Sequence, residues 1–395
     1  MPIDVRRARA ETPGCAEVLH FNNAGAALMP RSVLEAVTAH LELESRIGGY
    51  EAANREEARW EATYDAIARL LHCARDEIAV VENATRAWDM AFYAVPLGPG
   101  DRVLTARAEY VSNYLALLQV ARRTGATVEV VPSDGTGQLD VEALRRMLDE
   151  RVKLVAVTHV PTNGGLVNPV EEIGRVVRGH GHGGGALYLV DACQSAGQLP
   201  LDVERIGCDL LSATGRKFLR GPRGTGFLYV RRAVLERLEP PFVDLHAATW
   251  VAADRYEWRP DARRFENWET NYATKIGLGV AVAYALDWGL AAIWERGRAL
   301  GELLRRRLAE VPGVRVHDLG AVKGCIVTFT VAGRDPNDLK AALLQRRINV
   351  SVSLVEYARL DMEPRGLERM VRASVHYYNT EDEVERFVTA VRALA

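Results

Sequence analysis

The stretch Leu210-Leu-Ser-Ala-Thr-Gly-Arg-Lys217-Phe-Leu-Arg-Gly-Pro-Arg-Gly-Thr-Gly-Phe-Leu-Tyr-Val230 places a lysine in a glycine-rich loop between two apolar runs. Each run has the length and composition of a buried β-strand. Lysine is scarce, with only five among the 50 Lys and Arg residues, so an arbitrary basic position would be expected to hold Arg. A lysine amine can form a Schiff base, which a guanidinium cannot, and Lys217 is therefore a candidate catalytic residue.

A carboxylate ends another apolar run, Ala-Leu-Tyr-Leu-Val190-Asp191. A strand-end lysine and a strand-end aspartate are what an enzyme using pyridoxal 5'-phosphate (PLP) requires. The amine forms a Schiff base with the cofactor, and the carboxylate keeps the pyridine nitrogen protonated so that the ring can accept electrons. Lys217 and Asp191 therefore predict PLP as the cofactor.

Between residues 60 and 235, short Val/Leu/Ile-rich runs alternate with amphipathic stretches, which is typical of a mostly parallel sheet covered on both faces. We expect an α/β fold with seven strands, at 78–81, 102–105, 127–131, 154–159, 186–190, 210–213 and 226–230. Ligands of such sheets bind beyond the carboxyl ends of the strands. His159, Asp191 and Thr214 stand at such ends.

The C-terminal part has a different pattern and predicts a smaller α+β domain. A long helix is expected over 276–308, followed by strands at 313–316, 325–331, 348–352 and 371–377 and helices at 336–346 and 380–393. We expect the N-terminal segment to pack onto this part. The predicted domains are 20–275, a large PLP-binding domain, and 276–395 with 1–19, a small one.

The amino-acid composition limits the classes of partner and the cellular location that we expect for this protein. The net charge of −2 with interleaved acids and bases does not favour nucleic acid or an anionic membrane as a partner. No apolar run approaches the ~20 residues of a membrane span, and the N-terminus lacks a signal-peptide core. Five irregularly spaced cysteines indicate reduced thiols and a cytoplasmic protein. Cys193 is expected to pack in the core, although it stands close enough to Asp191 to line a site.

Two local features bear on phosphate and metal binding. Glu82-Asn83-Ala84-Thr85 follows a strand and opens a helix, so it is either a phosphate cradle or a plain helix cap. Thr214 is either a second phosphate contact or a strand-end turn residue. The segment His180-Gly-His182-Gly-Gly-Gly185 indicates a loop, and we expect no metal site.

These segments together resemble the class V aminotransferase family of fold-type I PLP enzymes, which includes cysteine desulfurases, isopenicillin N epimerase and kynureninase-like lyases. The resemblance runs from Phe21-Asn-Asn-Ala-Gly25 to the segment 372–380. It is most specific in Val190-Asp-Ala-Cys-Gln194 and in the Lys217 segment. It implies a homodimer with its sites at the interface and an amino-acid substrate.

The resemblance also implies roles for individual residues. Lys217 would shuttle the Cα proton, Asp191 would pair with the pyridine nitrogen, and Arg372 would grip the substrate carboxylate through a bidentate fork. Asn23 is the second expected substrate-binding residue. Ala84, Thr85 and Thr214 would hold the phosphate, and Arg216 either adds a charge-assisted phosphate contact or points away. Gln194 would bind the ring hydroxyl, Tyr110 would stack on the ring, and His159 and Asn163 would border it.

Two positions in the sequence differ from the family pattern, and they bear on the expected reaction and on the expected contact between subunits. Cysteine desulfurases carry a sulfur-attacking cysteine in a loop before the carboxylate arginine, but Asn349-Val-Ser-Val-Ser-Leu-Val-Glu-Tyr-Ala-Arg359 has none. In Arg264-Phe-Glu-Asn-Trp-Glu-Thr-Asn271, the position of an inter-subunit phosphate contact holds Glu269, with Thr270 one residue further.

From the missing loop cysteine we expect a β-eliminating C–S lyase that acts on a cysteine S-conjugate or sulfoxide without a persulfide cysteine. The stretch 44–52 and the Lys217 run are similar to those of hercynylcysteine sulfoxide lyases. An aminotransferase and an amino-acid epimerase or racemase stay open as alternatives. A non-catalytic PLP-binding regulatory protein is a remote one.

Overall fold

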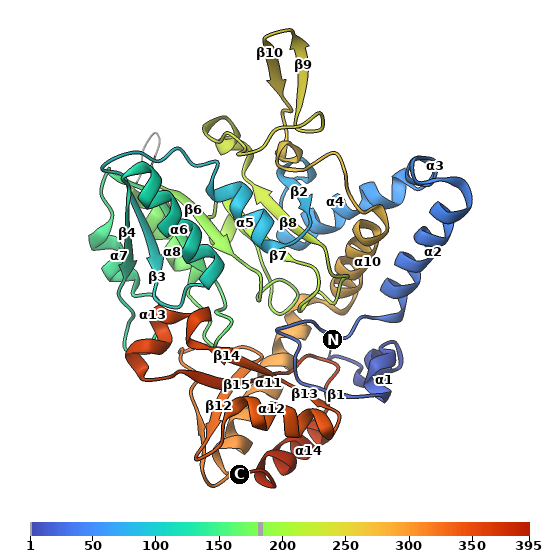
Figure 1. Ribbon diagram of the computed structural model, residues 1–395, viewed down its shortest axis with the longest axis vertical. Coiled ribbons are helices and arrows are strands. Elements are labelled where there is room, and N and C mark those ends of the chain that lie inside the picture. The colour runs from blue at the N-terminus through green and yellow to red at the C-terminus, as the bar shows by residue number, and fades with distance from the viewer. Residues whose placement is uncertain (1, 181–184) are drawn as a thin grey trace.

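The apolar runs form a seven-stranded sheet in a computed structural model that describes residues 2–180 and 185–395 (Figure 1). All neighbouring strands are parallel except β8, which is antiparallel to both of its neighbours. The strand order is β2 (Ile78–Val81), β8 (Gly226–Val230), β7 (Leu210–Thr214), β6 (Leu187–Asp191), β5 (Val152–Thr158), β3 (Arg102–Ala106) and β4 (Thr127–Val131). The predicted α/β fold with a mostly parallel seven-stranded sheet is confirmed.

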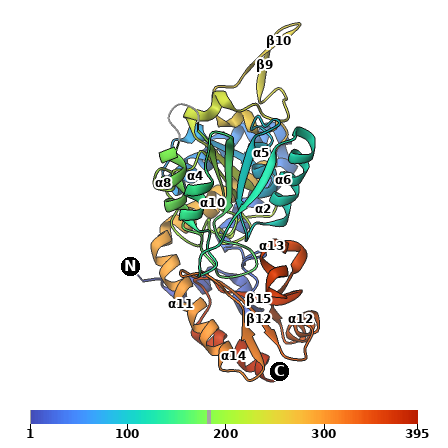
Figure 2. The ribbon, with the colours of Figure 1, turned by 90° about the vertical axis from the view of Figure 1, so that its left-hand side faces the viewer.

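Helices cover both faces of the sheet, as Figure 2 shows with α6 and α8 on opposite sides. Because successive side chains of a strand point to opposite faces, Leu154 and Ala156 join one apolar cluster while Val155 and Val157 join the other. The first cluster includes α5 (Ala84–Phe92) and α6 (Val111–Thr124), and the second includes α4 (Glu57–Leu71), α7 (Val141–Met147), α8 (Val170–His180) and α9 (Val203–Ile206).

The smaller C-terminal unit is built on an antiparallel four-stranded sheet. It lies below the carboxyl ends of β5, β6 and β7 (Figure 1). Its strands are, in spatial order, β11 (Val314–Val316), β12 (Ile326–Val331), β15 (Arg369–Ser374) and β14 (Ser351–Leu354), and its helices are α11 (Leu290–Ala309), α12 (Pro336–Gln345), α13 (Arg359–Met362) and α14 (Glu381–Arg392).

The N-terminal segment packs onto this unit. β1 (Leu19–His20) pairs with β13 (Ile348–Asn349), and Asn22 bridges to Ser374. The remaining N-terminal helices are α1 (Val5–Ala10), α2 (Arg31–Ile47) and α3 (Gly49–Arg55).

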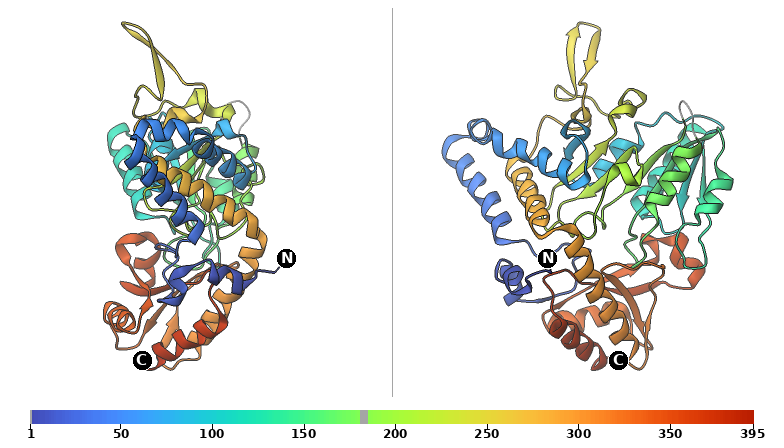
Figure 3. Two further views of the ribbon diagram at one scale, coloured as in Figure 1. Left: turned by 90° about the vertical axis from the view of Figure 1, so that its right-hand side faces the viewer. Right: turned by 180° about the vertical axis from the view of Figure 1, so that it is seen from behind.

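The prediction of a single long helix over 276–308 is wrong. The segment forms α10 (Tyr272–Trp288) and α11, which meet at an angle of 79° (Figure 3). Gly289 joins them with φ +81°, a backbone conformation that glycine adopts without steric cost. Since α10 packs against α2 and α4, the chain stays beside these two helices up to Gly289, where it bends into α11.

Two remaining features concern the surface. The hairpin of β9 (Ala248–Ala252) and β10 (Arg255–Trp258) projects from the end of the molecule opposite the small unit (Figure 1). Across the described residues no individual helix could cross a membrane; only α10 and α11 taken together have the length and apolar composition, and they are sharply bent. In the predicted loop around His182, residues 181–184 lie outside the described residues.

Candidate active site

Lys217 lies in the loop that follows β7 and lines a cavity of about 520 Å³. Its side chain is buried, and its Nζ lies 3.2 Å from Cys193 Sγ. The cavity is lined by side chains from the loops at the carboxyl ends of the strands and from the start of α5: Glu82, Asn83, Ala84, Thr85, Tyr110, Thr158, Val160, Thr162, Asp191, Cys193, Gln194, Arg216, Lys217, Arg223 and Gly224. The topology therefore gathers residues far apart in sequence around one lysine.

Asp191 is the last residue of β6 and is buried in the same cavity. Its Oδ1 accepts the backbone N–H of Cys193 at 2.8 Å, and its Oδ2 accepts Asn113 Nδ2 at 2.9 Å. Burial raises the pKa of Asp191, whereas these two donors and the Lys217 ammonium act in the opposite direction. A cation or a protonated ring nitrogen at this carboxylate would be strongly favoured, since it would compensate the desolvated charge.

The start of α5 forms one end of the cavity. The Asn83 side chain caps the helix by accepting the N–H of Arg86 at 2.9 Å, and Ala84 and Thr85 stand at the helix positions whose N–H groups have no intrahelical acceptor. The guanidinium of Arg216 faces the same cavity and donates to Thr214 Oγ1 at 3.1 Å. Two free backbone donors, a helix dipole and an arginine make this end suited to a phosphate.

Gly226 lets β8 approach this helix start closely. A Cβ built on Gly226 would lie 2.5 Å from the carbonyl carbon of Asn83 and 2.9 Å from the nitrogen of Ala84. The absence of a side chain at Gly226 therefore allows β8 to lie this close to the phosphate-suited start of α5.

Arg372, on β15 of the small unit, reaches toward the cavity from the other side. Its Nη1 donates to Thr162 Oγ1 at 2.6 Å, and Thr162 in turn accepts Gln194 Nε2 at 3.2 Å. Burial lowers the pKa of Arg372 to about 10, so the guanidinium stays charged near neutral pH. Arg372 Nε and Gln194 Oε1 have no hydrogen-bond partner among the described residues, and both are buried. Buried polar atoms without a hydrogen-bond partner in the protein indicate that a polar ligand binds next to them.

Five predicted site residues do not line this cavity. Two of them contact residues that do, because Thr214 accepts from Arg216 and Arg372 donates to Thr162. The other three lie elsewhere. The side chain of His159 borders a separate cavity, because it alternates along the chain with Thr158 and Val160, which line the lysine cavity. Asn163 donates to Met362 Sδ at 2.9 Å. Asn23 donates to the Ser374 carbonyl at 2.7 Å and so joins the N-terminal segment to the small unit.

Sequence reasoning also missed residues at the site. Asn22 rather than Asn23 meets Arg372, with Oδ1 3.5 Å from Nη2. Cys193, for which the sequence favours a core position and leaves a place in the site open, lines the cavity. Glu109 and Asn113 form a buried network behind Asp191, and the polar spacing Glu109-x-x-x-Asn113 at a helix start is the signal that could have found it.

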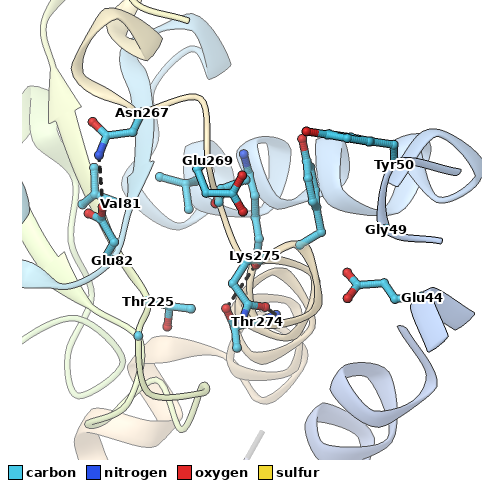
Figure 4. A pocket seen from close by; sticks show the side chains of 15 residues that line it. Glu44, Gly49, Tyr50, Val81, Glu82, Thr225, Asn267, Glu269, Thr274 and Lys275 are labelled. Carbon is cyan, nitrogen blue, oxygen red and sulfur yellow. Dashed lines mark hydrogen bonds between the residues drawn. The ribbon is translucent and has the colours of Figure 1, made fainter. Parts of the chain in front are cut away.

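A second cavity, of about 580 Å³, adjoins the phosphate-suited end and shares Glu82 and Gly224 with the first. Figure 4 shows Glu269 facing into it beside the labelled Lys275 and Tyr50. Thr270 also lines it. The segment predicted to reach a partner subunit therefore lies exposed near the phosphate-suited end.

The residues present fit PLP. The lysine, the carboxylate, the phosphate-suited helix start and the unpartnered Gln194 Oε1 surround one cavity. Within residues 2–180 and 185–395, no group of three or more His, Cys, Asp or Glu side chains is placed to hold a metal ion.

Comparisons with known proteins give matches over nearly the whole chain. The family model described as Aminotransferase class-V matches residues 19–387. A probable cysteine desulfurase of Methanothermobacter thermautotrophicus is 31% identical over 390 residues, which are 97% of this chain and 95% of that relative. The solved structure of a cysteine desulfurase from Thermococcus onnurineus is similar with a TM-score of 0.91 at 28% identity, covering 100% of this chain and 98% of that one.

The protein C-DES, described as a cystine C–S lyase, is also similar. Its structure with glycine covalently linked to PLP has a TM-score of 0.87 at 26% identity and covers 97% of this chain and 98% of that one. Its complex with the reaction product cysteine persulfide has a TM-score of 0.86 at 26% identity, covering 96% and 99%.

These relatives overturn the expectation of a C–S lyase without a persulfide cysteine. Proteins named cysteine desulfurases match nearly the whole chain, and they point to a persulfide-forming enzyme. The expectation rested on the loop 349–359 alone. Tertiary structure places a thiol from another segment, Cys193, beside the lysine.

Proposed function

Because the chain belongs to the class V aminotransferase family of PLP-dependent enzymes, we propose that it acts on cysteine and mobilises the cysteine sulfur as a persulfide. The observation that carries this proposal is the thiol of Cys193 at 3.2 Å from Lys217 Nζ, in one cavity with Asp191. The names of the relatives support the substrate class.

In this proposal Lys217 binds the cofactor aldehyde, Asp191 faces the pyridine nitrogen, and Ala84, Thr85 and Arg216 hold the phosphate. When bound, PLP supplies an electron sink that stabilises negative charge developed on the substrate carbons. Arg372 binds the substrate carboxylate, and Thr162 holds the guanidinium in place by accepting from Nη1.

The sulfur step follows from the position of Cys193. Burial raises the pKa of this thiol, and a positive charge on Lys217 lowers it. The thiolate therefore forms when the neutral Lys217 amine accepts the thiol proton and becomes the ammonium that stabilises it. The thiolate attacks the substrate sulfur, a new S–S bond forms on Cys193, and the Cβ–S bond breaks with its electron pair passing to carbon. Protonation of that carbon gives alanine, and no external oxidant or reductant is needed.

The test measures products from L-cysteine with the PLP-loaded protein. The expected products are alanine and reductant-releasable sulfide in equal amounts, with a persulfide mapped to Cys193 by alkylation and peptide analysis. Cys193→Ser should lose sulfur transfer, and Cys73→Ser, which changes a thiol outside the cavity, is the matched control. Pyruvate in place of alanine would overturn the proposal, and an unchanged Cys193→Ser rate would overturn the role of this thiol.

We further propose that the protein is a homodimer with the cavity of Glu269 and Thr270 at the interface. In support, that cavity adjoins the phosphate-suited end, and large apolar side chains are exposed on the hairpin and its surroundings: Phe242, Val243, Leu245, Trp250, Tyr256 and Trp268. Large apolar side chains exposed in one region of a protein are typical of interaction sites.

A further inference from the structure

Behind Asp191 lies a buried amide that contacts two carboxylates. Asn113, in the first turn of α6, donates through Nδ2 to Asp191 Oδ2 and to Glu109 Oε1, both at 2.9 Å. The two hydrogens of one amide nitrogen can serve both acceptors. Asn113 is therefore a direct link between Asp191 and Glu109.

Glu109 is held in one orientation by neutral donors. Besides Asn113, its Oε1 accepts the backbone N–H of Tyr110 at 2.8 Å and the Thr158 hydroxyl, and its Oε2 accepts the Thr105 hydroxyl at 3.0 Å. The side chain is buried, and among the described residues no cation acts on it. Burying a carboxylate without a cation costs free energy, which these neutral donors offset only in part.

The network fixes the orientation of the Asp191 carboxylate relative to the cavity. One oxygen is engaged by the Cys193 N–H and the other by Asn113, so the carboxylate cannot rotate away from the cavity. A negative charge at Glu109 raises the proton affinity of Asp191, since the two carboxylates repel. The ionised Glu109 also adds to the negative potential that Asp191 presents to the cavity, which favours the protonated form of a pyridine nitrogen bound there.

We propose that Glu109 and Asn113 are positioning residues that orient Asp191 and set its proton affinity, and so tune how strongly the PLP ring withdraws electrons. This inference rests on the proposed role of Asp191. It is independent of which amino acid the enzyme converts.

The test uses the PLP-loaded protein without substrate. Glu109→Gln keeps the shape and removes the charge, so the pyridine nitrogen should be less protonated and the ring should withdraw fewer electrons. The nitrogen linking cofactor and lysine then becomes more basic. We expect the pH midpoint of the visible absorption change, titrated between pH 6 and 10, to rise by about one unit, a tenfold change in proton affinity.

A second readout uses PLP labelled with ¹⁵N at the pyridine nitrogen. Glu109→Gln and Asn113→Ser should both move its NMR shift toward the unprotonated value. Gln119→Ala is the control, because Gln119 lies on the same helix but contacts Tyr93. A wild-type midpoint and ¹⁵N shift in Glu109→Gln would overturn the inference, whereas a wild-type spectrum in Asp191→Ala would overturn the proposed site itself.

Discussion

At the scale of single residues, Arg372 combines a charge with almost complete burial. It lies beside Thr162, its pKa is lowered to about 10, and its Nε has no partner among the described residues. A guanidinium in this setting favours binding of a carboxylate, because the carboxylate would neutralise the buried charge and accept a hydrogen bond from the unpaired N–H.

Arg372→Lys should therefore weaken amino-acid binding while leaving the cofactor in place, since a lysine cannot form the bidentate fork. We expect KM for cysteine to rise by roughly tenfold or more, corresponding to loss of a charge-assisted hydrogen bond. Steady-state kinetics with a parallel absorption spectrum measures both quantities. Arg369→Lys on the same strand, with a partly exposed side chain, is the control. An unchanged KM would contradict the assignment.

Glu109 makes a pH-dependent contribution to stability. Burial raises its pKa from the ordinary 4.5 to about 7. A carboxyl group with a higher pKa in the folded state takes up a proton on folding, so its contribution to stability falls as pH rises from 4.5 through 7.

Cofactor-free wild-type protein should therefore lose stability relative to Glu109→Gln between pH 5 and pH 8, by on the order of 2 kcal/mol. Urea unfolding of both proteins at the two pH values measures the difference. His159, whose pKa burial lowers to about 4, has the opposite effect below pH 6.5, but it is common to both proteins and cancels. A difference independent of pH would contradict the prediction.

At the scale of elements, the site depends on how closely β8 approaches the first turn of α5. Gly226→Ala places a methyl group against Asn83 and Ala84, so the helix start must shift. We expect cofactor affinity to fall by at least about tenfold, because the phosphate-suited N–H groups move with it. Fluorescence titration with PLP measures the change. At Gly135 an added Cβ meets nothing within 4 Å, so Gly135→Ala should bind like wild type.

At the scale of the whole molecule, the projecting hairpin predicts association. Trp250 is 79% exposed, and its partner across the hairpin, Tyr256, is 45% exposed. We expect the wild-type protein to sediment as a dimer and Trp250→Glu to shift it toward monomer at low micromolar concentration. Leu344→Glu, which changes a residue 58% exposed on α12, is the control. A monomeric wild type in analytical ultracentrifugation would contradict the proposal.

The local pattern predicted most of the sheet because each strand is short, apolar and bounded by turns. β2, β4 and β8 have the expected bounds, and Asp191 and Thr214 do end their strands. The pattern failed at Gly289, where apolar residues continue through a bend that helical periodicity does not reveal.

Local apolar runs and residue chemistry were enough to predict the fold class, the cofactor and a central pair of Lys217 and Asp191. Which neighbours join this pair depends on the tertiary structure. In the folded chain, His159 borders a separate cavity because side chains alternate along the extended backbone. Asn22, not Asn23, contacts Arg372. Cys193 lies beside Lys217, and Asn113 lies beside Asp191. Such contacts join segments up to 350 residues apart, and their distances depend on how the layers pack rather than on any local pattern.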